Sequence, residues 1–154
     1  MHELDTTDKL ILKELQENNR VPAEELGIKL NLSTSAVQRR LKRLRTENII
    51  EADIAVIAPE VVGQVLHFVV EVSLELGNAA VIEEFKQLMH DCEEVMQCYY
   101  VAGLFDFILL VNTKDMASYE AFSNMHLMKN KHVKQYYTHV VLNTVKKKYG
   151  VRLS

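Results

Sequence analysis

The segment from residue 33 to residue 45 has the composition of a phosphate-binding surface. Its thirteen residues include no acidic side chain and five cations: Arg39, Arg40, Lys42, Arg43 and Arg45. Such a local concentration of positive charge attracts a phosphate backbone even where the surrounding domain is almost neutral. A solvated helix face without any ligand can have the same composition. The secondary structure that carries these charges is needed to distinguish a DNA-binding surface from such a face.

Three short helices are predicted to position these cations. Asp5 is suited to cap the first helix, because its side chain can accept backbone N–H groups of the first turn. Residues 23–30 are predicted to form the second helix, and Asn31 tolerates the left-handed backbone of a tight turn. Ser33 is expected to cap the third helix, which extends to about Thr46. Two helices joined by a short turn form a helix-turn-helix.

The third helix has an apolar and a polar side. At about 100° per residue, Val37, Leu41 and Leu44 lie on the apolar stripe. Arg40 lies at the edge of that stripe, so we expect it to pair with an acidic residue of its own domain rather than with DNA. An amphipathic helix with a basic, amide-bearing outer face is typical of DNA recognition, which favours the nucleic-acid reading.

The outer face of this helix is predicted to enter the major groove of double-stranded DNA. Gln38 and Arg39 are expected to read base edges, while Ser35, Lys42 and Arg43 mainly contact phosphates. The predicted DNA-binding residues are Ser33, Thr34, Ser35, Gln38, Arg39, Lys42 and Arg43. A dimer would present two such helices to half-sites about one helical turn apart.

Residues 51–64 are predicted to link this domain to a second one at residues 65–154, with a short strand at residues 54–57. Hydrophobic periodicity in the second domain indicates the order βαββαβ, with the first helix starting at Gly77-Asn78. The predicted fold class is α+β: an N-terminal winged or helix-turn-helix domain and a C-terminal ferredoxin-like βαββαβ domain.

The later strands of the second domain are predicted at residues 94–101, 104–111 and about 136–145, with a helix at residues 115–128. Residues 104–111 are apolar on both faces, which a sheet covered by helices on one side does not require. We therefore expect another subunit to cover the open face, and the protein to be at least a dimer.

Asp106 lies between Phe105 and Phe107, and a carboxylate among apolar residues needs a partner. Backbone N–H groups at the start of a strand are the simplest partner. The ammonium group of a ligand is the alternative. The residues alone leave both open.

Other reactive residue types form no recognisable site. His90, Cys92 and Cys98 match no standard zinc spacing, so we expect no metal ligand, and both cysteines to be free and to pack as small hydrophobic residues. No nucleophile elbow and no glycine-rich phosphate loop occurs. We accordingly predict no catalytic residue and no enzyme.

Short motifs in both domains share their order and spacing with one known family. They are Leu4-Asp5 with Asp8, Leu32-Ser33 with Val37, Arg40 and Leu44, Gly103-Leu104-Phe105-Asp106, and Asp115-Met116 with Tyr119. In these motifs the chain resembles, over essentially its whole length, the Lrp/AsnC (leucine-responsive regulator/AsnC, or feast/famine) family of prokaryotic transcription regulators.

The resemblance implies a DNA-binding domain joined to an amino-acid-sensing and oligomerisation domain, whose dimers assemble into tetramers or octamers. Backbone groups of Gly103, Leu104 and Phe105 would bind the carboxylate of the effector. Asp106 would bind its ammonium group, and Thr138 would approach it from a neighbouring subunit. The apolar surroundings of this turn favour leucine or methionine as the effector, and no other cofactor is expected.

The distribution of charge agrees with this division. The chain of 154 residues has a net charge of −3, yet residues 1–50 carry nine basic and eight acidic side chains, against nine and thirteen in residues 51–154. No apolar run approaches the roughly 20 residues that span a bilayer, and the acidic N-terminus is not typical of an export signal. We expect a cytoplasmic, nucleoid-associated protein without a membrane partner.

Two other functional classes stay open at this point. One is a stand-alone amino-acid-sensing or interaction module, in which the N-terminal helices would bind protein. The other is a small ferredoxin-like enzyme without DNA binding, which would require a catalytic set that the motifs do not supply.

Overall fold

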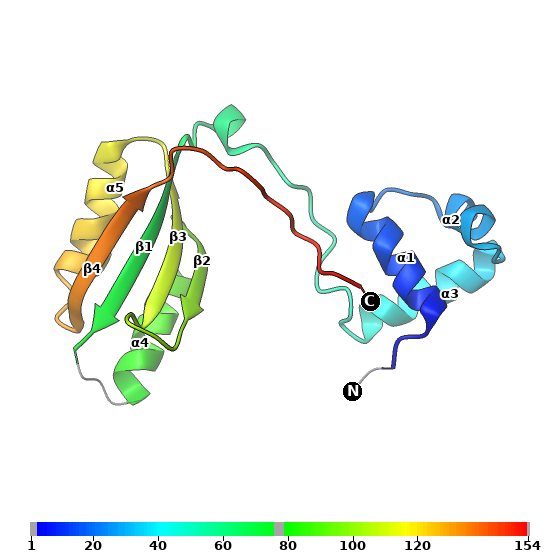
Figure 1. Ribbon diagram of the computed structural model, residues 1–154, viewed down its shortest axis with the longest axis horizontal. Coiled ribbons are helices and arrows are strands. Elements are labelled where there is room, and N and C mark those ends of the chain that lie inside the picture. The colour runs from blue at the N-terminus through cyan, green and yellow to red at the C-terminus, as the bar shows by residue number, and fades with distance from the viewer. Residues whose placement is uncertain (1–2, 76–78, 154) are drawn as a thin grey trace. The chain divides into compact units, whose positions relative to one another are not determined.

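The computed structural model describes residues 3–75 and 79–153. These residues form two compact units (Figure 1). Unit 1 contains residues 3–56 together with residues 146–153, and unit 2 contains residues 57–145. In the described part of the chain, no helix is long and apolar enough to cross a membrane.

Unit 1 has three helices, α1 (Thr6–Glu17), α2 (Ala23–Leu30) and α3 (Thr34–Thr46). Local capping explains their limits: Asp5 accepts from the Asp8 N–H at 2.7 Å, and Ser33 accepts from the Ala36 N–H at 3.2 Å. Asn31 ends α2 with a left-handed backbone, at φ 55°. The predicted helices, caps and turn are confirmed, and the described residues of unit 1 add no strand that would form a wing.

Apolar side chains on the inner faces of the helices form the core of unit 1: Ile11, Leu12, Leu26, Val37 and Leu44. Leu153 packs against this cluster, and the Val151 N–H donates to Gln16 Oε1 at 2.5 Å. Residues 146–153, which were expected to extend the second domain, are therefore held by unit 1.

The strand predicted at residues 54–57 is wrong. These residues have no regular structure, and the Ile54 and Ile57 side chains are 69% and 61% exposed. A β-branched run forms a strand only when a neighbouring strand satisfies its backbone groups, and the described residues provide none at this point. A short 3₁₀ helix, η1 (Pro59–Val62), follows instead.

Unit 2 has the predicted ferredoxin-like topology. Its elements are β1 (Leu66–Leu74), α4 (Ala79–His90), β2 (Val95–Tyr100), β3 (Phe107–Thr113), α5 (Met116–Ser123), a π-helical turn η2 (Asn124–Met128) and β4 (Val133–Val140). The strands form one antiparallel sheet in the order β2-β3-β1-β4. The predicted start of the first helix at Gly77-Asn78 lies outside the described residues.

Both helices of unit 2 cover the same face of the sheet (Figure 1). Alternate residues of the central strands are buried beneath them: Phe68, Val70 and Val72 of β1, and Phe107, Leu109 and Val111 of β3. The opposite face carries Val69, Ile108 and Leu110, which are only half-buried. The sheet therefore has one covered face and one open face, on which these apolar residues lie among polar ones such as His67, Glu71 and Asn112.

The later strands have limits that differ from the predicted ones. The strand predicted at residues 104–111 begins only at Phe107, because Leu104 and the residues beside it form an exposed turn before the hydrogen-bonded ladder. The last strand ends at Val140 rather than Val145, since no strand pairs with residues 142–145 in the described part of the chain.

Candidate functional site

The outer face of α3 is open to solvent. Six of the seven predicted DNA-binding residues are exposed, and only Arg43 is half-buried. Ser33 is also the N-cap, and its hydroxyl lies 3.2 Å from that of Ser35. The fold thus gathers the predicted residues on one accessible helix and its cap.

Three of the five cations of this segment are paired with carboxylates of unit 1. Arg40 Nη1 donates to Asp5 Oδ2 at 2.6 Å and to Asp8 Oδ1 at 2.7 Å. Arg43 Nη2 donates to the other oxygen of Asp8, whose side chain is 0% exposed. The prediction that Arg40 pairs within its own domain is confirmed.

The hydrogen bonds within this group shift the pKa values of Asp5 and Arg40. Hydrogen bonds from the Asp8 backbone N–H and then from Arg40 lower the pKa of Asp5, while hydrogen bonds to Asp5 and Asp8 raise the pKa of Arg40. Asp8 joins α1 to α3 because it receives a donor from both arginines. This buried connection was not apparent from the sequence, where Asp8 stood out only as part of a motif with Leu4 and Asp5.

The remaining charges on α3 differ in availability. Arg45 is paired with Asp53, with Nε 2.7 Å from Oδ2. Arg39 and Lys42 are exposed and have no ion pair among the described residues. The positive surface that α3 can offer to a phosphate backbone is therefore centred on these two side chains.

The turn between α2 and α3 depends on a close backbone approach at Gly27. Its carbonyl accepts the Leu32 N–H at 2.8 Å, and a Cβ at this position would lie 2.7 Å from the Leu32 carbonyl oxygen. Only glycine fits this buried position without displacing backbone atoms. The motif gains its fixed geometry from this contact and from Asn31.

Asp106 immediately precedes β3 in unit 2. Its Oδ2 accepts the Leu74 N–H at 2.8 Å, and its own N–H donates to the Val72 carbonyl at 3.0 Å. The backbone-amide partner considered from the sequence is thus present for one oxygen. Among the described residues the second oxygen, Oδ1, receives no donor.

The turn before Asp106 presents unused donors. Within residues 3–75 and 79–153, the backbone N–H groups of Gly103, Leu104 and Phe105 have no acceptor. The Leu104 side chain is 91% exposed, and the Phe105 ring meets the Tyr137 ring edge-on, with centroids 5.8 Å apart. Among the residues that the structure describes, the turn and Asp106 together offer three N–H groups without an acceptor, one carboxylate oxygen without a donor and an exposed apolar side chain.

Thr138 does not join this group within one chain. Its hydroxyl is hydrogen-bonded to that of Tyr119, whose ring stacks on Phe68 on the helix-covered face. Burial raises the pKa of Tyr119. Thr138 and Tyr137 are successive residues of β4 and point to opposite faces, so only Tyr137 approaches the turn.

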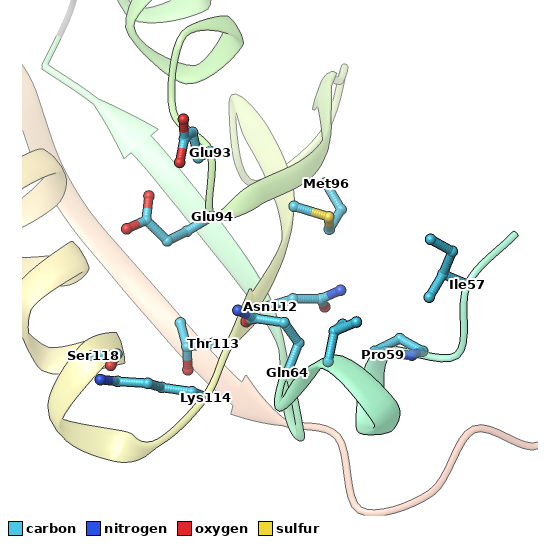
Figure 2. Close-up of a pocket in the computed structure, with 11 residues that line it drawn as sticks. Ile57, Pro59, Gln64, Glu93, Glu94, Met96, Asn112, Thr113, Lys114 and Ser118 are labelled. Carbon is cyan, nitrogen blue, oxygen red and sulfur yellow. The ribbon is translucent and has the colours of Figure 1, made fainter. Parts of the chain in front are cut away.

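A cavity of about 430 Å³ lies at the other end of β3, near Lys114 (Figure 2). Its lining combines both signs of charge with amides and apolar groups, including Glu93, Glu94, Asn112, Lys114, Met96 and Ile57. No spacing in the sequence indicated it, because its residues come from three separate segments, residues 57–64, 93–96 and 112–118. Glu94 also belongs to a cluster with Cys92 and His126 whose potential ligand atoms lie within 4.8 Å of one another.

Both units match known protein families. Residues 4–45 match the AsnC-type helix-turn-helix domain, and residues 67–151 match the Lrp/AsnC ligand binding domain. An HTH-type transcriptional regulator of Sinorhizobium fredii is 44% identical over 149 residues, covering 97% of this chain and 88% of the relative. A leucine-responsive regulatory protein of Haemophilus influenzae is 34% identical, covering 93% and 86%.

Solved structures lead to the same family. A transcriptional regulator of Neisseria meningitidis, crystallised in complex with L-methionine, superposes with a TM-score of 0.91 at 30% identity and 97% coverage of both chains. These relatives and solved structures are transcriptional regulators rather than enzymes, which argues against the enzyme alternative. The chain belongs to the Lrp/AsnC family and is a transcriptional regulator that joins a helix-turn-helix domain to a ligand-binding domain.

Proposed function

We propose that this regulator binds double-stranded DNA through α3 and that a free amino acid, leucine or methionine, controls its assembly and DNA binding. The observation that carries the proposal is the division of charges on α3. Arg40, Arg43 and Arg45 are held by carboxylates, while Arg39 and Lys42 extend from an exposed face without ion pairs among the described residues.

Each exposed residue of α3 has a proposed role. Gln38 and Arg39 read base edges in the major groove, because amide and guanidinium groups form paired hydrogen bonds with purines. Lys42 contacts phosphate, as do Ser33, Thr34 and Ser35 at the N-terminal end of the helix. Arg43 reaches phosphate only while it is also bound to Asp8, so we assign it the smaller contribution.

The effector is proposed to bind at the turn before Asp106. The free N–H groups of Gly103, Leu104 and Phe105 suit its carboxylate, and Asp106 Oδ1 suits its ammonium group. Leu104 supplies an apolar contact for the side chain. Relatives described as leucine-responsive, and a related regulator described in complex with L-methionine, support these two amino acids.

Self-association completes the proposed site. The open face of the sheet, with Val69, Ile108 and Leu110 half-buried in a single chain, suits a dimer formed by sheet packing. Dimers assemble further into a tetramer or octamer, in which Thr138 of a neighbouring subunit approaches the effector. An effector that prefers one assembly then couples amino-acid binding to DNA binding. We propose that the protein acts in the cytoplasm, on the DNA of the nucleoid.

The DNA part is tested by salt-titrated binding to mixed-sequence duplex DNA. Each lost phosphate contact reduces the slope of log K against log[salt] by about 0.9, so Lys42→Ala is expected to reduce it by that amount per bound protomer. Lys13→Ala is the matched control, because Lys13 is an exposed cation of α1 outside the proposed surface. DNA binding that does not depend on salt, or equal effects of both variants, would contradict the proposal.

The effector part is tested by measuring the thermal stabilisation that each of the twenty amino acids gives the full chain. Leucine or methionine is expected to stabilise the protein, and Asp106→Asn is expected to remove most of the effect. Asn at this position keeps an oxygen for the Leu74 N–H but has no charge for the ammonium group. Asp91→Asn removes an exposed charge elsewhere in unit 2 and serves as the control. Unchanged stabilisation of Asp106→Asn would refute the placement.

A further inference from the structure

Three side chains with metal-binding groups meet beside α5 in unit 2. Cys92 follows α4, Glu94 precedes β2, and His126 lies in the π-helical turn η2. One ligand atom from each lies within 4.8 Å of the others, and Cys92 Sγ is 3.1 Å from Glu94 Oε2. Zinc bonds of about 2.0–2.3 Å in a tetrahedron require ligand atoms about 3.5 Å apart, so shifts of about 1 Å close the set.

His126 is free to serve as a ligand. Its ring meets that of Phe122 with centroids 5.4 Å apart, and its nitrogens have no hydrogen-bond partner in the described part of the chain. The turn that carries it is a π-helix, in which the Lys129 N–H donates to the Asn124 carbonyl five residues back. Single π-helical turns are rare and often occur at functional sites.

The Cys92 side chain is buried in the core cluster of unit 2, with 7% of its surface exposed. Burial, followed by the hydrogen bond to Glu94, raises the pKa of its thiol to about 11. The Cys92 thiol donates to the Glu94 carboxylate, with Sγ 3.1 Å from Oε2. A divalent cation can take the place of this shared proton, since thiolates and carboxylates are both metal ligands.

We propose that Cys92, Glu94 and His126 bind one Zn²⁺ ion, with water as the fourth ligand. Binding breaks the S–H bond of Cys92 and releases its proton to solvent, while the sulfur, a carboxylate oxygen and an imidazole nitrogen each donate an electron pair to the ion. A mixed sulfur, nitrogen and oxygen set suits zinc, whereas Mg²⁺ and Ca²⁺ prefer oxygen ligands alone.

The position of Glu94 gives the ion access to this cluster. Glu94 lines the cavity of about 430 Å³ as well as belonging to the cluster, and Figure 2 shows its carboxylate pointing away from Met96 toward α5. The ion would join the segment between α4 and β2 to the C-terminal end of α5. These two connections are distant in the sequence, so the zinc would stabilise unit 2 against unfolding.

Cobalt substitution tests the site in the reduced, tag-free, full-length protein. Titration with Co²⁺ is expected to produce a sulfur-to-cobalt charge-transfer band and intense d–d absorption that saturate at one equivalent. Added Zn²⁺ should bleach both, and a large excess of Mg²⁺ should bleach neither. Zn²⁺ should also raise the melting temperature of unit 2.

Variants assign the ligands. Cys92→Ser and His126→Ala should abolish the charge-transfer band or reduce its affinity at least tenfold, whereas Cys98→Ser and His90→Ala should bind as the wild type does. His126 is half-exposed, so His126→Ala keeps the test decisive if Cys92→Ser does not fold. Absence of the band from the wild type, its persistence in Cys92→Ser, or its loss in Cys98→Ser would overturn the proposal. The cobalt titration uses neither DNA nor an amino acid. A negative result would therefore leave the proposed DNA and effector binding unaffected.

Discussion

Replacing Asp8 with alanine is expected to destabilise unit 1 while leaving unit 2 intact. Asp8 is a fully buried carboxylate that accepts one hydrogen bond from Arg40, at 2.7 Å, and another from Arg43. These contacts join α1 to α3, the helix that carries the proposed DNA-binding face. The variant removes both contacts together with the hydrogen bond from the Asp5 N–H to Asp8 Oδ2. Arg40 keeps Asp5 as a partner, whereas the Arg43 guanidinium is left facing an apolar methyl group.

The size of the effect follows from the exposure of the three side chains. Charge-assisted hydrogen bonds contribute about 1.5–3 kcal/mol each, and breaking a buried ion pair costs about 3–5 kcal/mol. Arg40 and Arg43 are 25% and 40% exposed, so they regain part of their hydration and lower this cost. We expect a loss of about 2–4 kcal/mol, which is a large fraction of the stability of a domain of about 60 residues. The corresponding fall in melting temperature is about 10 °C or more.

Calorimetry of the full-length chain measures this directly. The Asp8→Ala variant should show an early transition for the helical unit, and a later one at the wild-type temperature for unit 2. DNA binding should be lost above the first transition, whereas stabilisation of the second by the amino-acid effector should persist. The temperature gap between the two transitions is therefore the quantity to report.

Asp53→Ala is the matched control, because its partner Arg45 and Asp53 itself are 42% and 38% exposed. Exposed ion pairs contribute up to about 1 kcal/mol, so this variant should melt close to the wild type. If Asp8→Ala melts within a degree or two of Asp53→Ala, the buried connection does not hold α3 against α1 and the reasoning is refuted.

Three further outcomes follow from the same structure. Gly27→Ala should destabilise unit 1 by about 1–3 kcal/mol in urea unfolding, because its Cβ would lie 2.7 Å from a backbone carbonyl oxygen. Asn31→Gly should be close to neutral in the same assay and Asn31→Ala should cost about 1 kcal/mol, because the backbone is left-handed there, and equal stability of the two would contradict this. In metal-free protein, alkylation of Cys92 should be slow at pH 8 and should accelerate as the pH rises toward 11, because burial raises the pKa of its thiol to about 11. Mass spectrometry of the labelled peptides measures this, and rapid labelling of Cys92 in folded protein at pH 8 would show that the thiol is not protected.

Local chemistry explains why much of unit 1 was predictable. The caps at Asp5 and Ser33 and the left-handed Asn31 act within three or four residues along the chain, so residue types and spacing are sufficient to place α1, α2 and α3. Strand limits were less predictable. The apolar run at residues 104–111 begins in a turn, and residues 54–57 lack a partner strand, because a strand is defined by its neighbour as well as by its own residues.

The candidate site divides in the same way. The sequence by itself determined the amphipathic basic helix, the order βαββαβ and the turn at Asp106, because hydrophobic periodicity or a short motif is sufficient to predict each of them. Only the tertiary structure decided that Asp8, 32 residues from Arg40, pairs with that cation, which leaves Arg39 and Lys42 on the surface. It alone brought His126 to Cys92. Coulombic pairing and metal ligation depend on distances of a few ångströms in space, and packing sets those distances for residues far apart in the chain.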